Sequence, residues 1–304
     1  MTAVSTSEPV STLADSQGPA RRRWDGMFRL VMYVCIAFAI VTLGALLLFV
    51  VTEGWSRLGA SLVTSQPSAR PARAGFESAL WGSVFVVALT GALSLPLGVG
   101  TAVYLEEFAH HGRWYNRLID LTIQNLAGVP SIVFGVLALG FIARKGAFGL
   151  GLGWGFTVGA AALTLTLVVL PTVIIASREA IRAVPPSLRQ GALALGATQW
   201  QTVQKQVLPS AVPGIATGSI LAVSRALVES APLLLIGGVT FLTKNPTKLD
   251  APFTVMPLMI YNYIADSRAG FRTLAAAGIV LLLVVLLLMN SVAIVVRNRF
   301  QKKW

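Results

Sequence analysis

Several uninterrupted apolar runs, each about 20 residues or longer, constrain this chain more than any other feature of its sequence. Charged residues make up only 12% of its 304 residues, and hydrophobic residues make up 55%. An ordinary soluble domain carries about 25% charged residues. Because about 20 apolar residues in a helix match the thickness of the hydrocarbon core of a bilayer, the runs predict membrane helices.

The runs predict an all-α membrane protein with six transmembrane helices and both termini in the cytoplasm. The expected spans are 27–51, 77–104, 119–142, 153–176, 212–238 and 272–296. With this threading, the cytoplasmic side carries more Lys and Arg than the outside, as the positive-inside rule requires. Residues 1–25 are expected to form a disordered cytoplasmic tail, residues 26–304 the membrane domain, and residues 177–211 a long cytoplasmic connection.

Charge and cysteine content exclude several classes of function. The net charge of +12 is compatible with nucleic-acid binding, but basic ends and loops facing the cytoplasm explain it better, so no nucleic-acid partner is expected. The single cysteine, Cys35, excludes an internal disulfide and a multi-cysteine metal site. The adjacent His110 and His111 do not share a helix face, so no metal site is expected there.

The stretch QGALALGATQWQTVQKQVLP (190–209) in the cytoplasmic connection is only mildly apolar and rich in small residues. We expect two short helices with a corner between them. Pro185 and Pro186 favour a helix start, and Gly196 can end that helix in a left-handed conformation. Thr198 and Gln201 have the spacing of a capping box for the second helix.

The second helix should place Trp200, Val203 and Val207 on one face and should end at Pro209. Ala192 and its small neighbours leave a slim surface that another backbone can approach closely, and Trp200 is a residue type enriched in interfaces. From the residues alone, two alternatives stay open. The corner either docks on another protein or packs as a hairpin on its own membrane helices.

The same stretch resembles the EAA loop of ABC-importer permeases, in which a Glu-Ala-Ala triplet is followed by a glycine and then by Ile-x-Leu-Pro. The chain departs from that pattern at three positions, where Gln190 replaces the glutamate, Gly191 an alanine and Gln206 the isoleucine. The resemblance implies that the loop is the coupling helix that docks on a cytoplasmic ATPase. The implied ATPase-coupling residues are Gln190, Gly191, Ala192, Gly196, Trp200, Leu208 and Pro209.

Four further stretches resemble one branch of these permeases, the PstA-type permease of the phosphate ABC importer. They are GVGTAVYLEEFA (98–109), NLAGVPSIVFG (125–135), SRALVESAPLLLIGG (224–238) and FTVMPLMIYNY (253–263). With the loop, they cover roughly residues 75–297. The resemblance implies the type I permease fold, a place in the cytoplasmic membrane of a prokaryote and no enzymatic activity or cofactor in this chain.

The resemblance also implies the partners. They are a second permease (PstC-like), two copies of an ATPase subunit (PstB-like) that bind ATP and Mg, and an external phosphate-binding protein (PstS-like), all around a chain embedded in lipid. Glu106 and Glu107, just past the second span, are then expected in a solvated loop or in contact with the ATPase.

Two charged residues fall inside the fifth predicted span. Arg225 and Glu229 are four residues apart, which would place them on one helix face. A charge at the bilayer centre is costly, so such residues usually face a bundle interior or an aqueous path. Arginine offers a phosphate ion a fork of donors, and Glu229 could moderate its field. The two residues therefore predict a translocation pathway, or else a salt bridge that only holds helices together.

Asn125 and Ser131, with Pro130 between them, make the third predicted span polar and irregular, as Pro232 does for the fifth. Asn125 and Ser131 are candidates to line the pathway, or they join helices by hydrogen bonds. The apolar segment 251–264 outside the membrane is expected to be a re-entrant helix at the external mouth or a helix lying on the membrane surface.

Three functional alternatives remain open from the sequence. The first is a permease for another oxyanion, such as molybdate or sulfate. The second is a stand-alone ion-coupled transporter or channel, which would work without an ATPase. The third is a membrane scaffold or sensor without transport activity.

Overall fold

The computed structural model describes residues 19–110, 112–144, 151–238, 242 and 244–300. Over these residues the protein is helical and contains no strand; an isolated bridge pairs Thr157 with Pro252. The all-α prediction is therefore confirmed. Contacts divide the chain into two units, residues 1–52 and 53–304, and each is described by itself.

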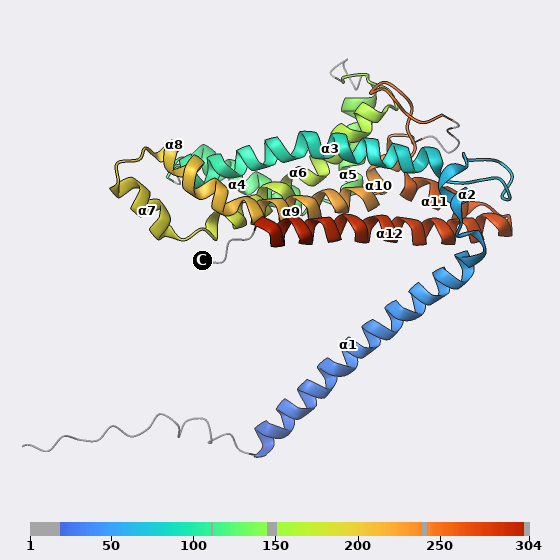
Figure 1. Cartoon of the computed structure of the whole chain (residues 1–304), viewed down its shortest axis with the longest axis horizontal. Helices are drawn as coiled ribbons and strands as arrows, with labels where there is room; N and C mark the ends of the chain where they lie inside the picture. Colours follow the sequence, from blue (N-terminus) through green and yellow to red (C-terminus); the bar gives the residue numbers. More distant parts are fainter. Residues whose placement is uncertain (1–18, 111, 145–150, 239–241, 243, 301–304) are drawn as a thin grey trace, which may run out of the picture. The chain divides into compact units, whose positions relative to one another are not determined.

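The first unit holds most of helix α1 (Pro19–Gly54; Figure 1). Its apolar stretch is the first predicted span, and no part of that stretch is buried within the chain. A helix that is apolar on all sides and buried on none needs lipid or another protein around it. The helix begins at Pro19, so the last residues of the predicted disordered tail are helical, and residues 1–18 lie outside the described part.

The second unit is a helical bundle with short helices at both ends (Figure 1). Its long helices are α3 (Glu77–Val103), α6 (Val158–Arg182), α9 (Leu208–Val228) and α12 (Ala269–Phe300). The shorter helices are α2 (Ala60–Thr64), α4 (Trp114–Ala127), α5 (Ser131–Ala138), α7 (Pro186–Ala194), α8 (Gln199–Thr202), α10 (Ala231–Leu235) and α11 (Met256–Ala265).

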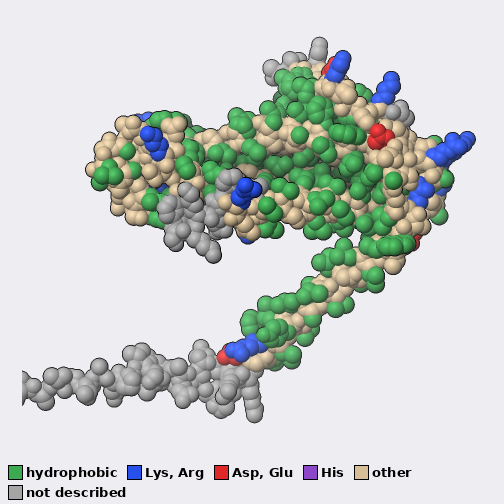
Figure 2. All heavy atoms as spheres, viewed as in Figure 1, with side chains coloured by type: hydrophobic (Ala, Val, Ile, Leu, Met, Phe, Trp, Pro, Cys, Tyr) green, Lys and Arg blue, Asp and Glu red, His purple; other side chains and the backbone are tan. Residues whose placement is uncertain are grey.

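Helix α6 is the centre of this unit. It packs against α3 and α9, and α12 packs against the outer side of α9. The main apolar core lies where α3, α6 and α9 meet, around Val86, Leu165 and Ala222. Large apolar side chains elsewhere on the long helices face outward, and Figure 2 shows them as a nearly continuous surface between charged ends. Such a surface is that of a membrane protein.

Small residues let α3 approach its neighbours closely. A Cβ atom on Gly98 would lie 2.6 Å from a side-chain methyl carbon of Val173 on α6, and one on Gly82 would lie 2.0 Å from the carbonyl oxygen of Thr254. Small residues at helix contacts are typical of membrane bundles, where close packing replaces the hydrophobic effect as the source of association.

Five helices in the described residues are long and apolar enough to cross a membrane. A sixth candidate is the third predicted span, which is a pair of helices, Trp114–Ala127 and Ser131–Ala143, bent by 103°. The irregular section expected in the span 119–142 is a full break, at which Gly128 and Pro130 interrupt the hydrogen-bond ladder. The fifth predicted span, 212–238, is also broken: α9 ends at Val228 and α10 follows as a separate short helix.

The segment 251–264 lies inside the bundle rather than on its surface. Phe253, Met256, Met259 and Tyr263 are all buried, and α11 packs against α12 and α3. Such burial fits the re-entrant alternative better than a helix lying flat on the membrane. At the same end, Arg268 hydrogen-bonds the Asp266 carboxylate, which lowers the pKa of that carboxyl to about 2.

Candidate functional site

A cavity of about 250 Å³ opens beside the two helix breaks. Its walls come from the chain between α4 and α5, from the middle of α6, and from the last turns of α9. The residues that line it are Leu126, Ala127, Gly128, Val129, Pro130, Ser131, Phe134, Val168, Val169, Thr172, Ala222, Arg225, Ala226 and Glu229. Three of the four predicted pathway residues, Ser131, Arg225 and Glu229, therefore meet in one cavity.

The salt bridge between Arg225 and Glu229 was one of two alternatives that the sequence left open. Helix α9 ends at Val228, and Glu229 has an extended conformation with φ −75° and ψ 116°. The residues from Arg225 to Val228 remain helical, and no ion pair joins Arg225 to Glu229 within the described residues. The hydroxyl of Ser131 instead donates a 2.8 Å hydrogen bond to Oε1 of Glu229. Glu229 thus links the start of α5 to the end of α9, and the donors of the Arg225 guanidinium remain available to another acceptor.

Asn125 does not belong to this group. It lies in the last turn of α4, is exposed, and is absent from the cavity wall. Its backbone carbonyl accepts the N–H of Gly128 where the helix ends, at 3.1 Å. The irregular section was predicted from Asn125, Pro130 and Ser131 together, and the structure places only the second and third at the cavity.

The depth of the cavity indicates why breaks in the helices are tolerated there. Val169 and Thr172 lie near the middle of the 25-residue helix α6, so the breaks lie at mid-bundle. Inside a bilayer, non-helical backbone is tolerated only where protein buries it or where it lines a water-filled space. Polar breaks, an arginine and a carboxylate at this depth have the features of a passage for a polar solute.

Gly135 sets the distance between the two short helices beside the cavity. A Cβ atom there would lie 2.7 Å from the Cα atom of Pro232 on α10. Because backbone atoms cannot turn away as a side chain can, we expect Gly135→Ala to cost about 1–3 kcal/mol of stability, as overpacking does. Thermal unfolding of the purified protein in detergent measures this as a lower melting temperature.

The matched control is Gly140→Ala, in the π-helical turn η4 (Leu139–Ala143) that continues α5. A Cβ atom at Gly140 meets nothing within 4 Å, so this change should leave the melting temperature unchanged or raise it. Equal effects of the two substitutions would contradict the close approach of α5 and α10.

The cytoplasmic corner, which consists of α7, α8 and the turn between them (residues 186–202), has the predicted local structure. Helix α7 begins at Pro186, and Gly196 has φ +84°. The N–H of Gly196 donates to the carbonyl of Leu193 and the N–H of Ala197 to that of Ala192, at 3.0 and 3.1 Å. These two bonds form a Schellman motif, which requires a left-handed residue at the glycine position.

The second half of the corner departs from the prediction at its end. Thr198 and Gln201 form the expected capping box at the start of α8, but Pro209 does not stop the helix. A π-helical turn, η6 (Val203–Val207), follows α8, and the helical run continues from Gln199 to Val228. The wider turn accommodates a residue that lacks an N–H, so Pro209 widens the ladder instead of ending it.

Most of the predicted coupling residues lie on an accessible surface, whereas Leu208 is partly buried against an apolar cluster. Helix α7 has no buried residue, and Gln190, Gly191 and Gly196 are exposed. Trp200 is 57% exposed, with its ring centroid 6.1 Å from that of Phe108. Leu195, which the sequence argument did not single out, is 91% exposed. This end of the chain therefore exposes Leu195 and Trp200, whereas Val203 and Val207 are buried against the neighbouring helices.

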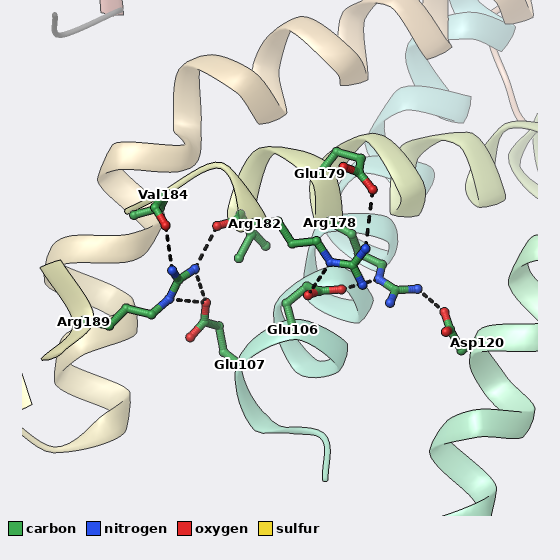
Figure 3. A network of polar contacts seen from close by, with 9 residues as sticks. Glu106, Glu107, Asp120, Arg178, Glu179, Arg182, Val184 and Arg189 are labelled. Carbon is green, nitrogen blue, oxygen red and sulfur yellow. Dashed lines mark hydrogen bonds and ion pairs between the residues drawn. The ribbon is translucent and has the colours of Figure 1, made fainter. Parts of the chain in front are cut away.

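The sequence argument also missed a charged network at this end of the bundle. Glu106 and Glu107 are not solvated, because their side chains are only 9% exposed and accept hydrogen bonds from arginines (Figure 3). The signal that could have found the network is the series of arginines near the end of α6 and the start of α7, which face two carboxylates from α3.

Comparisons with known families agree with the geometry. Residues 94–302 match the family model described as "Binding-protein-dependent transport system inner membrane component". The chain is 34% identical over 236 residues to the "Probable ABC transporter permease protein YqgI" of Bacillus subtilis, which covers 78% of this chain and 76% of that protein.

A second relative and a solved structure extend the comparison. The chain is 32% identical over 254 residues to the "Phosphate transport system permease protein PstA 1" of Mycobacterium tuberculosis, with 82% of this chain and 81% of that protein covered. A chain of a bacterial alginate ABC transporter crystallised with its periplasmic protein has the same fold, with a TM-score of 0.70 at 17% identity over 92% of this chain and 97% of the other.

Proposed function

Because this chain belongs to the family of binding-protein-dependent transport system inner membrane components, we propose that it moves inorganic phosphate across the cytoplasmic membrane. It is a multi-pass permease component of an ABC importer. The observation that carries the phosphate proposal is Arg225, which projects from α9 at a mid-bundle cavity bordered by two helix breaks. Relatives named for phosphate transport support the same choice.

The chemistry of the cavity suits an oxyanion in transit. A guanidinium presents planar donors that match phosphate oxygens, and charge-assisted hydrogen bonds of this kind are strong. An arginine alone would hold the anion too tightly for release. Glu229 lines the same cavity and adds a negative charge, which weakens the attraction so that the anion is guided rather than retained.

Arg225 also supports a second permease as partner. Its side chain is exposed in the single chain although it lies at mid-bundle. A charge facing lipid at this depth is costly, so this face needs another protein or water against it. A PstC-like permease packed on this face would close the passage between the two chains.

The exposed surface of the corner supports the proposal of an ATPase partner. We propose that two PstB-like ATPase subunits supply the energy, one of them docking on the exposed corner of this chain, while a PstS-like binding protein delivers phosphate from outside. ATP binding would favour the outward-facing arrangement, and hydrolysis would restore the inward-facing one. Such a shift requires ATP to bind one arrangement better than the other.

A transport assay tests the choice of substrate. Deleting the gene for this chain should abolish the uptake of radiolabelled phosphate from micromolar solution, and expressing the chain again should restore it. An excess of unlabelled phosphate should compete, whereas sulfate and molybdate should not. Competition by sulfate or molybdate, or unchanged phosphate uptake after deletion, would contradict the proposal.

A further inference from the structure

Helix α3 continues into a π-helical turn, η3 (Tyr104–Phe108), which carries the two largely buried carboxylates (Figure 3). Single π turns are uncommon and are frequent at functional positions in helices. Because adjacent residues of a helical turn point in different directions, Glu106 and Glu107 reach different neighbours.

Glu106 faces the membrane helices. Nε of Arg178 lies 2.5 Å from its Oε1, and Nε of Arg182 lies 2.8 Å from its Oε2. Arg178 also pairs with Asp120 on α4. This carboxylate therefore joins the end of α3 to α6 and, through Arg178, to α4.

Glu107 faces the corner. Nε and Nη2 of Arg189, on α7, lie 3.1 and 2.9 Å from its Oε1. The same guanidinium donates to the carbonyls of Val184 and Ile181, at 2.7 and 2.8 Å. Ile181 lies in the last turn of α6 and Val184 just beyond it, and a basic side chain is favourable at the C-terminal end of a helix.

The second helix of the corner reaches the same turn. The side-chain amide of Gln199 donates to the backbone carbonyl of Glu107, and the ring of Trp200 lies against that of Phe108. Both helices of the corner are thus attached to the last residues of α3. A small apolar cluster that includes Ala102, Ile181 and Val207 lies beside them.

These contacts differ from apolar packing in how they respond to a displacement of α7. Apolar side chains can slide past one another, whereas a guanidinium fork fixes both distance and direction between the groups it joins. A displacement of α7 therefore has to move the ends of α3 and α6 with it. Those two helices continue to mid-bundle, where α6 forms a wall of the cavity.

We propose that Arg189 is the positioning residue that transmits motion of the corner to the membrane helices, through Glu107 on η3, which continues α3, and through the carbonyls at the C-terminal end of α6. This inference rests on the proposed function. It predicts that a complex without the Arg189 guanidinium still hydrolyses ATP but transports less phosphate for each ATP.

The test uses the reconstituted complex of this chain with its second permease, ATPase and binding protein. Arg189→Gln should lower the phosphate transported per ATP hydrolysed by about fivefold or more, the lower end of typical coupling between sites. The ATPase should copurify as with the wild type. Arg189→Lys keeps the charge without the fork and should give an intermediate ratio. Glu107→Gln combined with Arg189→Gln should add little to either change alone.

The matched control is Lys205→Gln, which removes an exposed cation from the same cytoplasmic region; its transport ratio should equal the wild type. A merely structural role for Arg189 would lower protein amount, uptake and hydrolysis together and leave the ratio unchanged, which would overturn the inference. Loss of ATPase copurification in Arg189→Gln would also overturn it, since Arg189 would then be a docking residue. Wild-type complexes that fail to use ATP for uptake would refute the proposed function instead.

Discussion

Replacing Arg225 with glutamine should lower phosphate uptake about 10- to 100-fold. This factor corresponds to the loss of one charge-assisted hydrogen bond to the anion in a partly exposed cavity. Glutamine keeps a polar side chain of moderate length but removes the charge and the fork of donors. Because Arg225 makes no ion pair with the neighbouring Glu229, its removal leaves that carboxylate with its hydrogen bond from Ser131. The protein should therefore still insert and assemble, and uptake of labelled phosphate measures the loss.

Two further variants make this result specific. Arg225→Lys keeps the charge and should retain part of the uptake, since lysine is a point charge without a planar fork. Arg144→Gln removes an exposed cation that does not line the cavity and should leave uptake unchanged. Normal uptake in Arg225→Gln, with normal amounts of the assembled complex, would exclude a pathway role for this residue.

The second large effect is expected at the corner. Gly196→Val should reduce copurification of the ATPase about 5- to 30-fold, because 1–2 kcal/mol of backbone strain shifts a conformational equilibrium by that factor. Gly196 has φ +84°, a conformation in which a β-branched residue is a strong outlier. A Cβ atom there meets nothing within 4 Å, so strain in the backbone is the cause rather than a clash.

Gly196→Asn is the matched control for this effect. Asparagine tolerates the left-handed region and is found at the same position of Schellman motifs, so copurification should stay near the wild-type level. Membrane insertion of both variants is checked by their amount in the membrane fraction. Equal copurification of the valine and asparagine variants would show that the corner is not required for docking.

The lengths of the apolar runs made much of the fold predictable. A run of about 20 apolar residues has one stable solution in a bilayer, a helix, so the all-α class followed directly. The breaks were harder, because Pro130 and Pro232 lie in runs that remain apolar on both sides. The helices beside Pro130 are bent by 103°, and α5 packs on α10, a contact between residues almost 100 positions apart that no local pattern describes.

The candidate site was predictable in its residue types but not in its pairing. The intramembrane position of Arg225 and Glu229 predicted either a pathway or a salt bridge between them, and within the described residues no ion pair joins them. Ser131, the actual partner of Glu229, comes from the other broken span. Local sequence rules describe neighbours within one helix, whereas this hydrogen bond depends on where two helices stop.

The charged network shows the same limit. Glu106 and Glu107 follow an apolar run, where a sequence argument expects water or a partner protein. Their burial depends on Arg178 and Arg189, which come from α6 and α7. By contrast, the corner was predicted well at Gly196 and Thr198, because a Schellman motif and a capping box are local structures that a few consecutive residues determine.

ATP-dependent phosphate uptake by a reconstituted complex tests the central claim most directly. Vesicles would contain this chain, its second permease and the ATPase, with labelled phosphate and the binding protein on the external side and ATP on the side of the ATPase. Uptake should require both ATP and the binding protein and should not respond to an imposed proton or sodium gradient. Gradient-driven phosphate uptake by this chain without the ATPase would contradict the account.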